Sequence, residues 1–450
     1  MSDEAANSEL AVLVNINFQN TEFNEGLDEF IELVASAGLK SVATITCSRN
    51  TPDSSLYIGS GKAEEIKQAV ADNQADVVIF NHILSPRQER NLGNLCDCKV
   101  VDRVGLILDI FAQRARSFEG KLQVELAQLQ HLSSRLIRVW THLERQKGGI
   151  GLRGPGETQL ETDRRLIGKR IKTINTRLDK VRSQRQQGRK RRSKSNTPVV
   201  SLVGYTNAGK STLFNRLTGS NVYTANKLFA TLDPTFRRIE MAPATPVILT
   251  DTVGFIRHIP HDLVAAFHAT LEETRDADLL LHIVDATGDQ RDSQIEQVNL
   301  VINEIGAEDV PQIVVYNKID QLEELTARIE KDENGFPGRV WLSAKTGDGI
   351  ASLLDAITSF IRTKVQHHRL NIPASAGKLR ANLFNMGVVR TEENGEDGGW
   401  MMEVDMESHR LDQLFRESGL ELSQVLIEEI GQEVGQQTPM ESAMEDVLLQ

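Results

Sequence analysis

The sequence predicts an α/β protein in which two parallel-sheet domains flank an antiparallel helical hairpin. Short apolar runs alternate with amphipathic segments over residues 1–110 and again over residues 199–365, a pattern typical of parallel sheets covered by helices. Between these stretches, apolar residues recur at spacings of three and four, which indicates long helices. A loop of the form G-x-x-x-x-G-K-S follows the first strand of the second stretch.

The composition is that of an ordinary globular protein. The chain has 450 residues, of which 40% are hydrophobic and 25% charged, enough for about three domains. Its 3 cysteines are too few for a disulfide framework, and Cys96 and Cys98 lack the second pair that zinc requires. No signal peptide and no apolar run of about 18 residues stands out. We therefore expect a cytoplasmic protein without integral membrane contact, and we also expect it to be a monomer.

The N-terminal α/β domain is assigned to residues 1–110. Strands are expected at 10–18, 41–47, 76–81 and 99–102, and helices at 26–38, 61–73 and 85–96. Ser85 is the expected N-cap of the third helix, with Pro86 at its first position. The run Ile58 to Lys62, with Gly61, precedes the second helix and could hold a phosphate, although a plain helix-start turn is the simpler explanation.

The helical hairpin is assigned to residues 111–190. One apolar stripe runs from Leu122 to Leu143 and a second from Leu160 to Val181, so two amphipathic helices should fold back on each other. The loop 147–157 between them has 5 glycines in the nine residues from 148 to 156 and would form the tip. A basic linker is expected at 191–198.

Charge is distributed unevenly along the chain. The net charge is -12, yet residues 164–194 contain 14 Lys or Arg against one acid, and residues 391–450 contain 16 acids against 2 Arg. The basic run favours a polyanionic partner such as RNA, and a solvated helix face is the plainer alternative. Peripheral membrane association is a weaker alternative, because no Trp or Phe face accompanies the basic residues.

The motif from Gly204 to Ser211 predicts a phosphate-binding loop. It lies between a strand at 199–203 and a helix, the context that such a loop requires. Lys210 would reach the β and γ phosphates, and Ser211 would bind Mg²⁺. Asn207 could additionally bind K⁺.

Later motifs predict that the nucleotide is GTP or GDP. Thr231 would complete the Mg²⁺ shell and sense the γ phosphate, with Thr235 as the fallback; Asp251 would bind Mg²⁺ through water, and the Gly254 N–H would meet the γ phosphate. Asp320 would accept both guanine N–H groups, Asn317 would contact the Hoogsteen edge, Lys318 would cover the base, and the Ala344 N–H would donate to guanine O6. The catalytic residues are expected to be Lys210, Thr231 and Gly254. The full predicted GTP site comprises Gly204, Tyr205, Thr206, Asn207, Ala208, Gly209, Lys210, Ser211, Phe229, Ala230, Thr231, Leu232, Asp233, Asp251, Thr252, Val253, Gly254, Asn317, Lys318, Asp320, Ser343, Ala344 and Lys345.

Phe255 occupies the position after Gly254 where many GTPases have a glutamine that orients water. A phenyl ring cannot orient water by hydrogen bonding. His258 and His261 in the same loop could orient it instead, but nothing in the sequence favours either residue. We therefore expect weak hydrolysis until a partner reorders the loops.

The C-terminal region is less clearly patterned. A small β-α domain is expected at 366–430, with a hairpin around the turn 394–399 and helices at 409–418 and 421–431. Residues 431–450 are expected to be a disordered acidic tail.

The motifs GYTNAGKS, FATLDPT, DTVGFIRHIPHDLVAAF, NKID and GGIGLRGPGETQLETDRR resemble those of the HflX family of GTPases over residues 10 to 365. The resemblance implies binding to the large ribosomal subunit (50S), dissociation of stalled or vacant 70S ribosomes, notably after heat stress, and ribosome-stimulated hydrolysis. It implies that the tip reaches rRNA near the peptidyl-transferase centre, through Lys147, Gly149, Arg153, Gly154 and Gly156. It also points to ATP as a candidate ligand of the N-terminal domain. The alternative is a GTP-switched ribosome assembly or regulatory factor without splitting activity.

Overall fold

The computed structural model divides the chain into two compact units, Met1–Ser193 with Thr197–Leu354, and Lys194–Asn196 with Asp355–Gln450. The structure describes residues 9–18, 23–140, 155–194, 197–219, 228–229, 231–241, 245–256, 273–288, 290–332, 335–364, 366–395, 398–406, 411, 414–415, 418 and 426–430. Among these, no helix is both long and apolar enough to cross a membrane.

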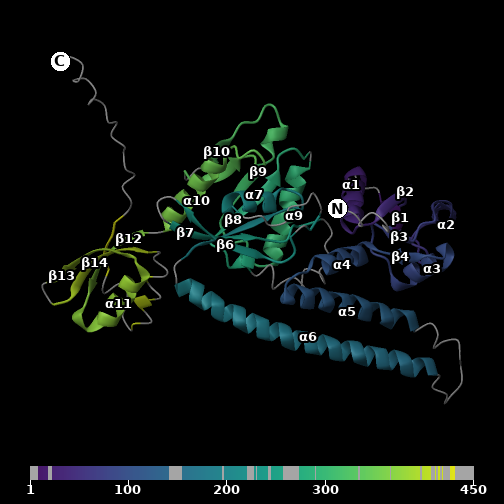
Figure 1. The fold of residues 1–450 in the computed structure, drawn as a ribbon, viewed down its shortest axis with the longest axis horizontal. Helices are drawn as coiled ribbons and strands as arrows, with labels where there is room; N and C mark the ends of the chain where they lie inside the picture. Colours follow the sequence, from purple (N-terminus) through teal and green to yellow (C-terminus); the bar gives the residue numbers. More distant parts are fainter. Residues whose placement is uncertain are drawn as a thin grey trace. The chain divides into compact units, whose positions relative to one another are not determined.

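The N-terminal domain is a parallel sheet covered by helices, as the alternating pattern predicts (Figure 1). Its strands are β1 (Leu10–Asn17), β2 (Lys40–Ser48), β3 (Val77–Phe80) and β4 (Lys99–Val101), in the order β2-β1-β3-β4. The helices are α1 (Phe23–Ser36), α2 (Ser60–Asn73) and α3 (Pro86–Cys96). Ser85 caps α3 in a capping box with Gln88, which confirms the predicted start of this helix.

Three helices follow this domain: α4 (Arg103–Arg114), α5 (Phe118–Trp140) and α6 (Pro155–Lys194). The predicted apolar stripes meet where Leu122 and Leu126 of α5 pack with Ile174 and Leu178 of α6. The two helices run side by side in Figure 1.

Helix α6 is longer than the sequence pattern predicts at both ends. Residues 155–157, expected in the tip loop, form its first turn, which tolerates Pro155 because no helical bond to its missing N–H is needed. Residues 191–194, expected in a linker, form its last turn, because Lys, Arg and Gln favour helix even without an apolar stripe. Residues 141–154 lie outside the described part of the chain.

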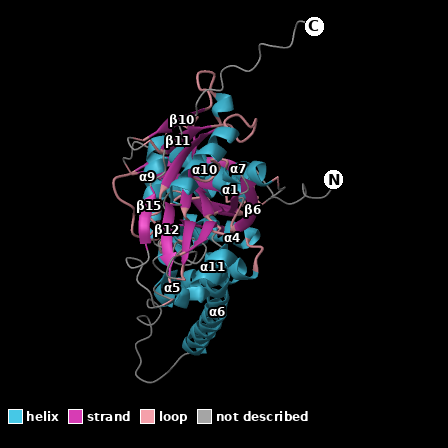
Figure 2. Cartoon of the chain, turned by 90° about the vertical axis from the view of Figure 1, so that its left-hand side faces the viewer, coloured by secondary structure: helices cyan, strands magenta, loops and turns pink. Residues whose placement is uncertain are grey.

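The second α/β domain contains a sheet ordered β10-β11-β9-β8-β5-β7-β6. Its central strands are parallel: β5 (Val199–Gly204), β7 (Thr245–Asp251), β8 (Leu279–Asp285), β9 (Gln312–Asn317) and β11 (Pro337–Trp341). The edge strands β6 (Thr235–Met241) and β10 (Arg328–Lys331) pair antiparallel. Figure 2 shows α9 (Arg291–Glu304) and α7 (Lys210–Thr218) on opposite sides of the sheet. Helix α10 (Ile350–Lys364) follows β11 in the chain.

The C-terminal sheet is antiparallel, in the order β13-β14-β12-β15. It is built from β12 (Gln366–Ile372), β13 (Val389–Asn394), β14 (Trp400–Met406) and β15 (Leu426–Ile430), with α11 (Gly377–Met386) alongside. The hairpin β13–β14 confirms the predicted turn, but its first strand starts later than expected because residues 382–386 belong to α11.

The helix predicted at 421–431 is wrong for its described part. Residues 426–430 form β15, which pairs with β12. The local pattern favours a helix, but pairing with β12 decides the structure here, because the backbone N–H and C=O groups of β12 can bond to those of the segment. Within the helix expected at 409–418, Leu411 and Phe415 are helical and fully buried. The predicted tail 431–450 lies outside the described residues.

Candidate nucleotide site

The carboxyl ends of the parallel strands bring the predicted motifs together at one edge of the second sheet. The loop 204–211 follows β5, Asp251 ends β7, Asn317 ends β9, and Ser343 follows β11. In doubly wound sheets this edge is where ligands bind. The strands thus collect residues that lie more than a hundred positions apart in the sequence.

Two glycines give the phosphate-binding loop its shape. Gly204 has a φ of +145°, and a Cβ there would lie 2.2 Å from the Ile283 carbonyl oxygen. Gly209 has a φ of +95°, and a Cβ there would lie 2.2 Å from Asn317 Nδ2. Both positions require glycine, because the backbone conformation and the space exclude any side chain.

Lys210 lies at the first position of α7 with its side chain folded under the loop. Its Nζ donates to the carbonyl oxygens of Gly204 at 3.0 Å and Tyr205 at 2.7 Å. Burial lowers the pKa of Lys210 to about 8, and the nearby Asp251 opposes that shift. A phosphate above the loop would restore the charged form, because an anion stabilises a buried ammonium.

Three oxygen-bearing side chains converge beside Lys210. Ser211 Oγ donates to Asp251 Oδ2 at 2.7 Å, Thr231 Oγ1 donates to the same oxygen at 3.0 Å, and the two hydroxyls lie 2.9 Å apart. Burial raises the pKa of Asp251, against the bonds from Ser211 and Thr231 that lower it. The other oxygen, Asp251 Oδ1, is buried and has no hydrogen-bond partner. Hydroxyl and carboxylate oxygens with an unsatisfied acceptor fit the oxygen-only coordination that Mg²⁺ prefers.

Gly254 and Phe255 close the site over the phosphate loop. A Cβ on Gly254 would lie 2.8 Å from Thr206 Cγ2 and 3.0 Å from Lys210 Nζ. The Phe255 N–H donates to the Gly204 carbonyl, and its carbonyl accepts from the Thr206 N–H. The Phe255 side chain is only 3% exposed, so it packs in the core. His258 and His261 lie outside the described residues.

The base-recognition motifs are held in place by bonds to one another. Asn317 Nδ2 donates to the Ala208 carbonyl, and Asn317 Oδ1 accepts from the Ala344 N–H. Asn317 therefore has one amide hydrogen left for a base, and the Ala344 N–H, predicted to donate to guanine O6, is engaged by Asn317 instead. Ser343 Oγ donates to Asp320 Oδ1, and Lys318 pairs with Asp285 at 2.6 Å.

Several predicted site residues have their side chains elsewhere. Phe229 and Leu232 are 2% and 3% exposed within the hydrophobic core, and the Asp233 carboxylate lies at the start of α5. The Thr252 hydroxyl donates to the Leu202 carbonyl, and Val253 is buried. The Lys345 carbonyl accepts from Arg216. Ala230 lies outside the described residues.

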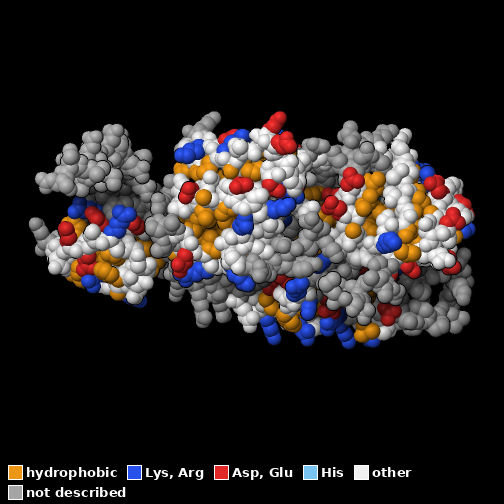
Figure 3. All heavy atoms as spheres, turned by 45° about the horizontal axis from the view of Figure 1, so that its top comes forward, with side chains coloured by type: hydrophobic (Ala, Val, Ile, Leu, Met, Phe, Trp, Pro, Cys, Tyr) orange, Lys and Arg blue, Asp and Glu red, His pale blue; other side chains and the backbone are white. Residues whose placement is uncertain are grey.

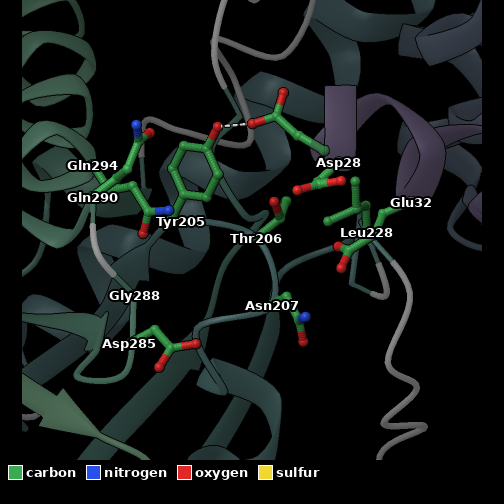
Figure 4. Close-up of a pocket in the computed structure, with 11 residues that line it drawn as sticks. Asp28, Glu32, Tyr205, Thr206, Asn207, Leu228, Asp285, Gly288, Gln290 and Gln294 are labelled. Carbon is green, nitrogen blue, oxygen red and sulfur yellow. Dashed lines mark hydrogen bonds between the residues drawn. The ribbon is translucent and has the colours of Figure 1, made fainter. Parts of the chain in front are cut away.

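A cavity of about 310 Å³ lies beside the phosphate loop. Figure 4 shows Asp28 and Glu32 of α1 near Thr206 and Asn207 of the loop. Thr206 Oγ1 is buried without a hydrogen-bond partner, and the Tyr205 hydroxyl donates to Glu29. The acidic residues of α1 could not be anticipated, because no local pattern links them to the loop; Asp285 could have been, because it ends β8 at the same sheet edge.

The sequence also predicts a phosphate site in the N-terminal domain and ribosome contacts at the tip of the hairpin. Lys62 in the N-terminal domain pairs with Glu65, and the N-cap of α2, Gly59, has no side chain to cap with. Lys147, Gly149, Arg153 and Gly154 lie outside the described residues, and Gly156 lies in the first turn of α6.

The chain matches four family models in sequence order. They are described as GTP-binding GTPase N-terminal (residues 24–112), GTP-binding GTPase Middle Region (114–192), 50S ribosome-binding GTPase (199–318) and HflX C-terminal domain (324–425). The match to the HflX C-terminal domain begins at residue 324, before β10 and β11. These two strands belong to the second sheet, because β11 pairs with β9 and β10 pairs with β11.

The chain is also similar to curated relatives over most of its length. It is 56% identical to GTPase HflX of Escherichia coli, over 90% of this chain and 95% of that one. It is 49% identical to GTPase HflX of Caldanaerobacter subterraneus subsp. tengcongensis, over 88% of this chain and 91% of that one. A GTP-binding protein from Sulfolobus solfataricus, solved in complex with GDP, is 26% identical, covering 79% of this chain and 99% of that one with a TM-score of 0.43.

Proposed function

The chain belongs to the HflX family of GTPases, and from that premise we propose that its GTP-bound form docks on the large ribosomal subunit and separates the two subunits of the 70S ribosome. In this proposal, stalled or vacant ribosomes, notably after heat stress, are the substrate. Contact with the ribosome accelerates hydrolysis, which resets the protein. The protein acts in the cytoplasm as a monomer.

At the nucleotide, each residue has a role that its position supports. Lys210 neutralises the β and γ phosphates, and Ser211, Thr231 and Asp251 would hold Mg²⁺, directly or through water. When bound, Mg²⁺ would supply positive charge to the phosphates. Gly254 offers its N–H to the γ phosphate, since only a side-chain-free residue fits beside Lys210 Nζ. Asp320 selects guanine, and Asn207, exposed at the loop, is the residue that would bind K⁺.

Phe255 gives a reason for dependence on a partner. Its side chain is buried, and its backbone bonds to the phosphate loop hold it there. The group that orients the attacking water must therefore come from a rearranged loop or from the partner, which supports slow hydrolysis away from the ribosome.

The observation that carries the ribosome proposal is the exposed basic face of α6. Every Lys and Arg between residues 161 and 184 is exposed: Arg164, Arg165, Lys169, Arg170, Lys172, Arg177, Lys180 and Arg182. Lys and Arg side chains also gather along the lower edge of the view in Figure 3. Such a helix suits an RNA backbone, which binds through phosphates and without sequence readout.

Co-sedimentation with purified large subunits tests this proposal. In the presence of a non-hydrolysable GTP analogue, the double variant Lys169→Gln/Lys172→Gln should bind about tenfold more weakly and show a salt dependence reduced by about two phosphate contacts. The matched control Arg237→Gln/Arg238→Gln removes two exposed charges from β6 and should bind like wild type. Equal binding by all three proteins would remove α6 from the interface.

The competing function is a GTP-switched assembly or regulatory factor that docks through the same hairpin. The two functions differ in the fate of intact 70S ribosomes, because only a splitting factor releases free subunits. Deleting residues 149–156 should abolish release and spare GTP binding if the tip performs the separation.

A further inference from the structure

The loop that carries Thr231 is held by contacts with residues of α1 and α4, outside its own domain. We call residues 228–233 the switch segment; Ala230 within it is outside the described residues. The Leu228 N–H donates to Ser36 Oγ of α1 at 2.9 Å, and Phe229 packs edge-on against Phe111 of α4 with ring centroids 4.7 Å apart. Both phenyl rings are 2% exposed. Leu228 and Phe229 are thus buried against the N-terminal half of the chain.

The last residue of the segment, Asp233, holds the N-terminus of α5. Its Oδ2 accepts from the backbone N–H groups of Arg116 at 2.8 Å and Ser117 at 2.7 Å, and its Oδ1 accepts from Ser117 Oγ at 2.5 Å. Ser117 Oγ in turn accepts from the Gly120 N–H at 2.8 Å. A carboxylate at a helix N-terminus is stabilised by the helix dipole and by unpaired N–H groups.

Gly120 makes room for this contact. A Cβ at Gly120 would lie 2.2 Å from Asp233 Oδ1, far inside any real contact distance. The absence of a side chain at position 120 is therefore a condition for Asp233 to reach the start of α5.

Two residues before Asp233, Thr231 lies on Ser211 and Asp251, where the Mg²⁺ of a bound nucleotide is expected. Two residues of extended chain span at most about 7 Å, so a shift of Asp233 must be felt at Thr231. Leu232 between them is 3% exposed, so packing also restrains this short link.

We propose that Ser117 and Gly120 are positioning residues for GTP hydrolysis, which act through Asp233 to hold Thr231 at the nucleotide. The inference rests on the role proposed above for Thr231. Movement of α5 changes the site where the γ phosphate is sensed, and by reciprocity GTP binding changes the restraint on α5.

The helix connects this contact to the rest of the hairpin. Helix α5 continues from Phe118 to Trp140, and Glu125 pairs with Arg170 of α6 beside the shared apolar cluster. A displacement of the hairpin can therefore be transmitted to Ser117 through the continuous helix α5 and the side chains packed between α5 and α6. This gives a partner on the hairpin a route to Thr231 that does not pass through the phosphate loop.

Gly120→Ala tests the inference without touching the nucleotide. Alanine favours helix more than glycine, so α5 should remain folded while Asp233 is displaced. The matched control is Gly168→Ala on α6, where a Cβ meets nothing within 4 Å. The readout is the ratio of affinities for a non-hydrolysable GTP analogue and for GDP, both with Mg²⁺, since a merely structural defect would weaken both nucleotides.

The expected result for Gly120→Ala is an analogue affinity about tenfold lower with GDP affinity unchanged, and a basal hydrolysis rate that falls with it. Ser117→Ala, which removes one of the three bonds to Asp233, should change the ratio in the same direction by less. Gly168→Ala should match wild type. An unchanged or raised ratio in both Gly120→Ala and Ser117→Ala overturns the inference.

Thr231→Ala separates this failure from failure of the proposed site. If Thr231→Ala lowers the ratio while the α5 variants do not, Thr231 senses GTP but α5 does not position it. If Thr231→Ala itself leaves the ratio unchanged, the proposed role of Thr231 is wrong and the inference falls with it.

Discussion

The phosphate loop and the switch segment serve the same nucleotide site but are stabilised by different parts of the chain. The loop is shaped largely by its own domain: Gly204 lies against Ile283, Lys210 donates into the loop, and Asn317 holds Ala208. The switch segment is fastened to Ser36, Phe111 and Ser117, all in the N-terminal half. The proposed phosphate-binding loop is thus built within one domain, whereas the segment proposed to sense the γ phosphate contacts two.

Removing the lysine of the phosphate loop should have the largest effect. Lys210→Ala should weaken GTP and GDP alike by about 100-fold or more, because it removes a buried charge from both phosphate complexes. Titration with fluorescent nucleotides measures this, with the exposed Lys331→Ala as a control. A loss confined to GTP would contradict the distinction between the loop and the switch segment.

Changing Asp320, the carboxylate proposed to bind guanine, should alter selectivity between bases and leave the proposed sensing of the γ phosphate intact. Asp320→Asn replaces an acceptor by a donor at the guanine N–H groups, so GTP affinity should fall more than about tenfold and xanthosine nucleotides should gain. Competition between the two nucleotides measures the shift. Unaltered preference for guanine would show that Asp320, which Ser343 orients, does not read the base.

The pH dependence of binding should follow Lys210. In the nucleotide-free protein burial lowers its pKa to about 8, and bound phosphates must raise it again. Affinity for GTP should therefore be level below the free-protein pKa and fall by about tenfold for each pH unit above it, until the bound-state pKa is reached. Binding titrations between about pH 7 and pH 9.5 test this, and GDP should follow the same profile. A level profile would show that Lys210 remains charged in the free loop.

Loosening the apolar anchor of the switch segment should have the smallest effect. Phe111→Leu removes the edge-on contact with Phe229, worth about 1 kcal/mol beyond burial, and should lower the affinity for a GTP analogue by about threefold to tenfold without changing GDP affinity. Phe30→Leu, equally buried in the same core cluster, is the matched control. If both variants change the two nucleotides equally, the contact stabilises the fold and not the sensing of GTP.

The difference between these two regions also explains which parts of the fold and of the site the sequence could predict. The parallel sheets and the phosphate loop are readable because their signals are local: alternating apolar runs, and glycines at fixed offsets from Lys210. Phe229 and Asp233 carry the same kind of motif signal, yet their side chains meet Phe111 and Ser117, over a hundred positions earlier in the chain. Likewise, the pairing of β15 with β12 overrides the helical pattern of residues 426–430. Motif spacing predicts which residues form the site, but it could not show which side chains another domain would engage.

In the proposed function, GTP in this site acts on the ribosome through the helical hairpin, and a sucrose gradient of purified 70S ribosomes examines that link in one experiment. With a non-hydrolysable GTP analogue the protein should convert 70S particles into free subunits, whereas GDP, or the analogue with the deletion of residues 149–156, should leave them intact. Intact 70S ribosomes with the analogue and the full-length protein would rule out the proposed separation of the subunits.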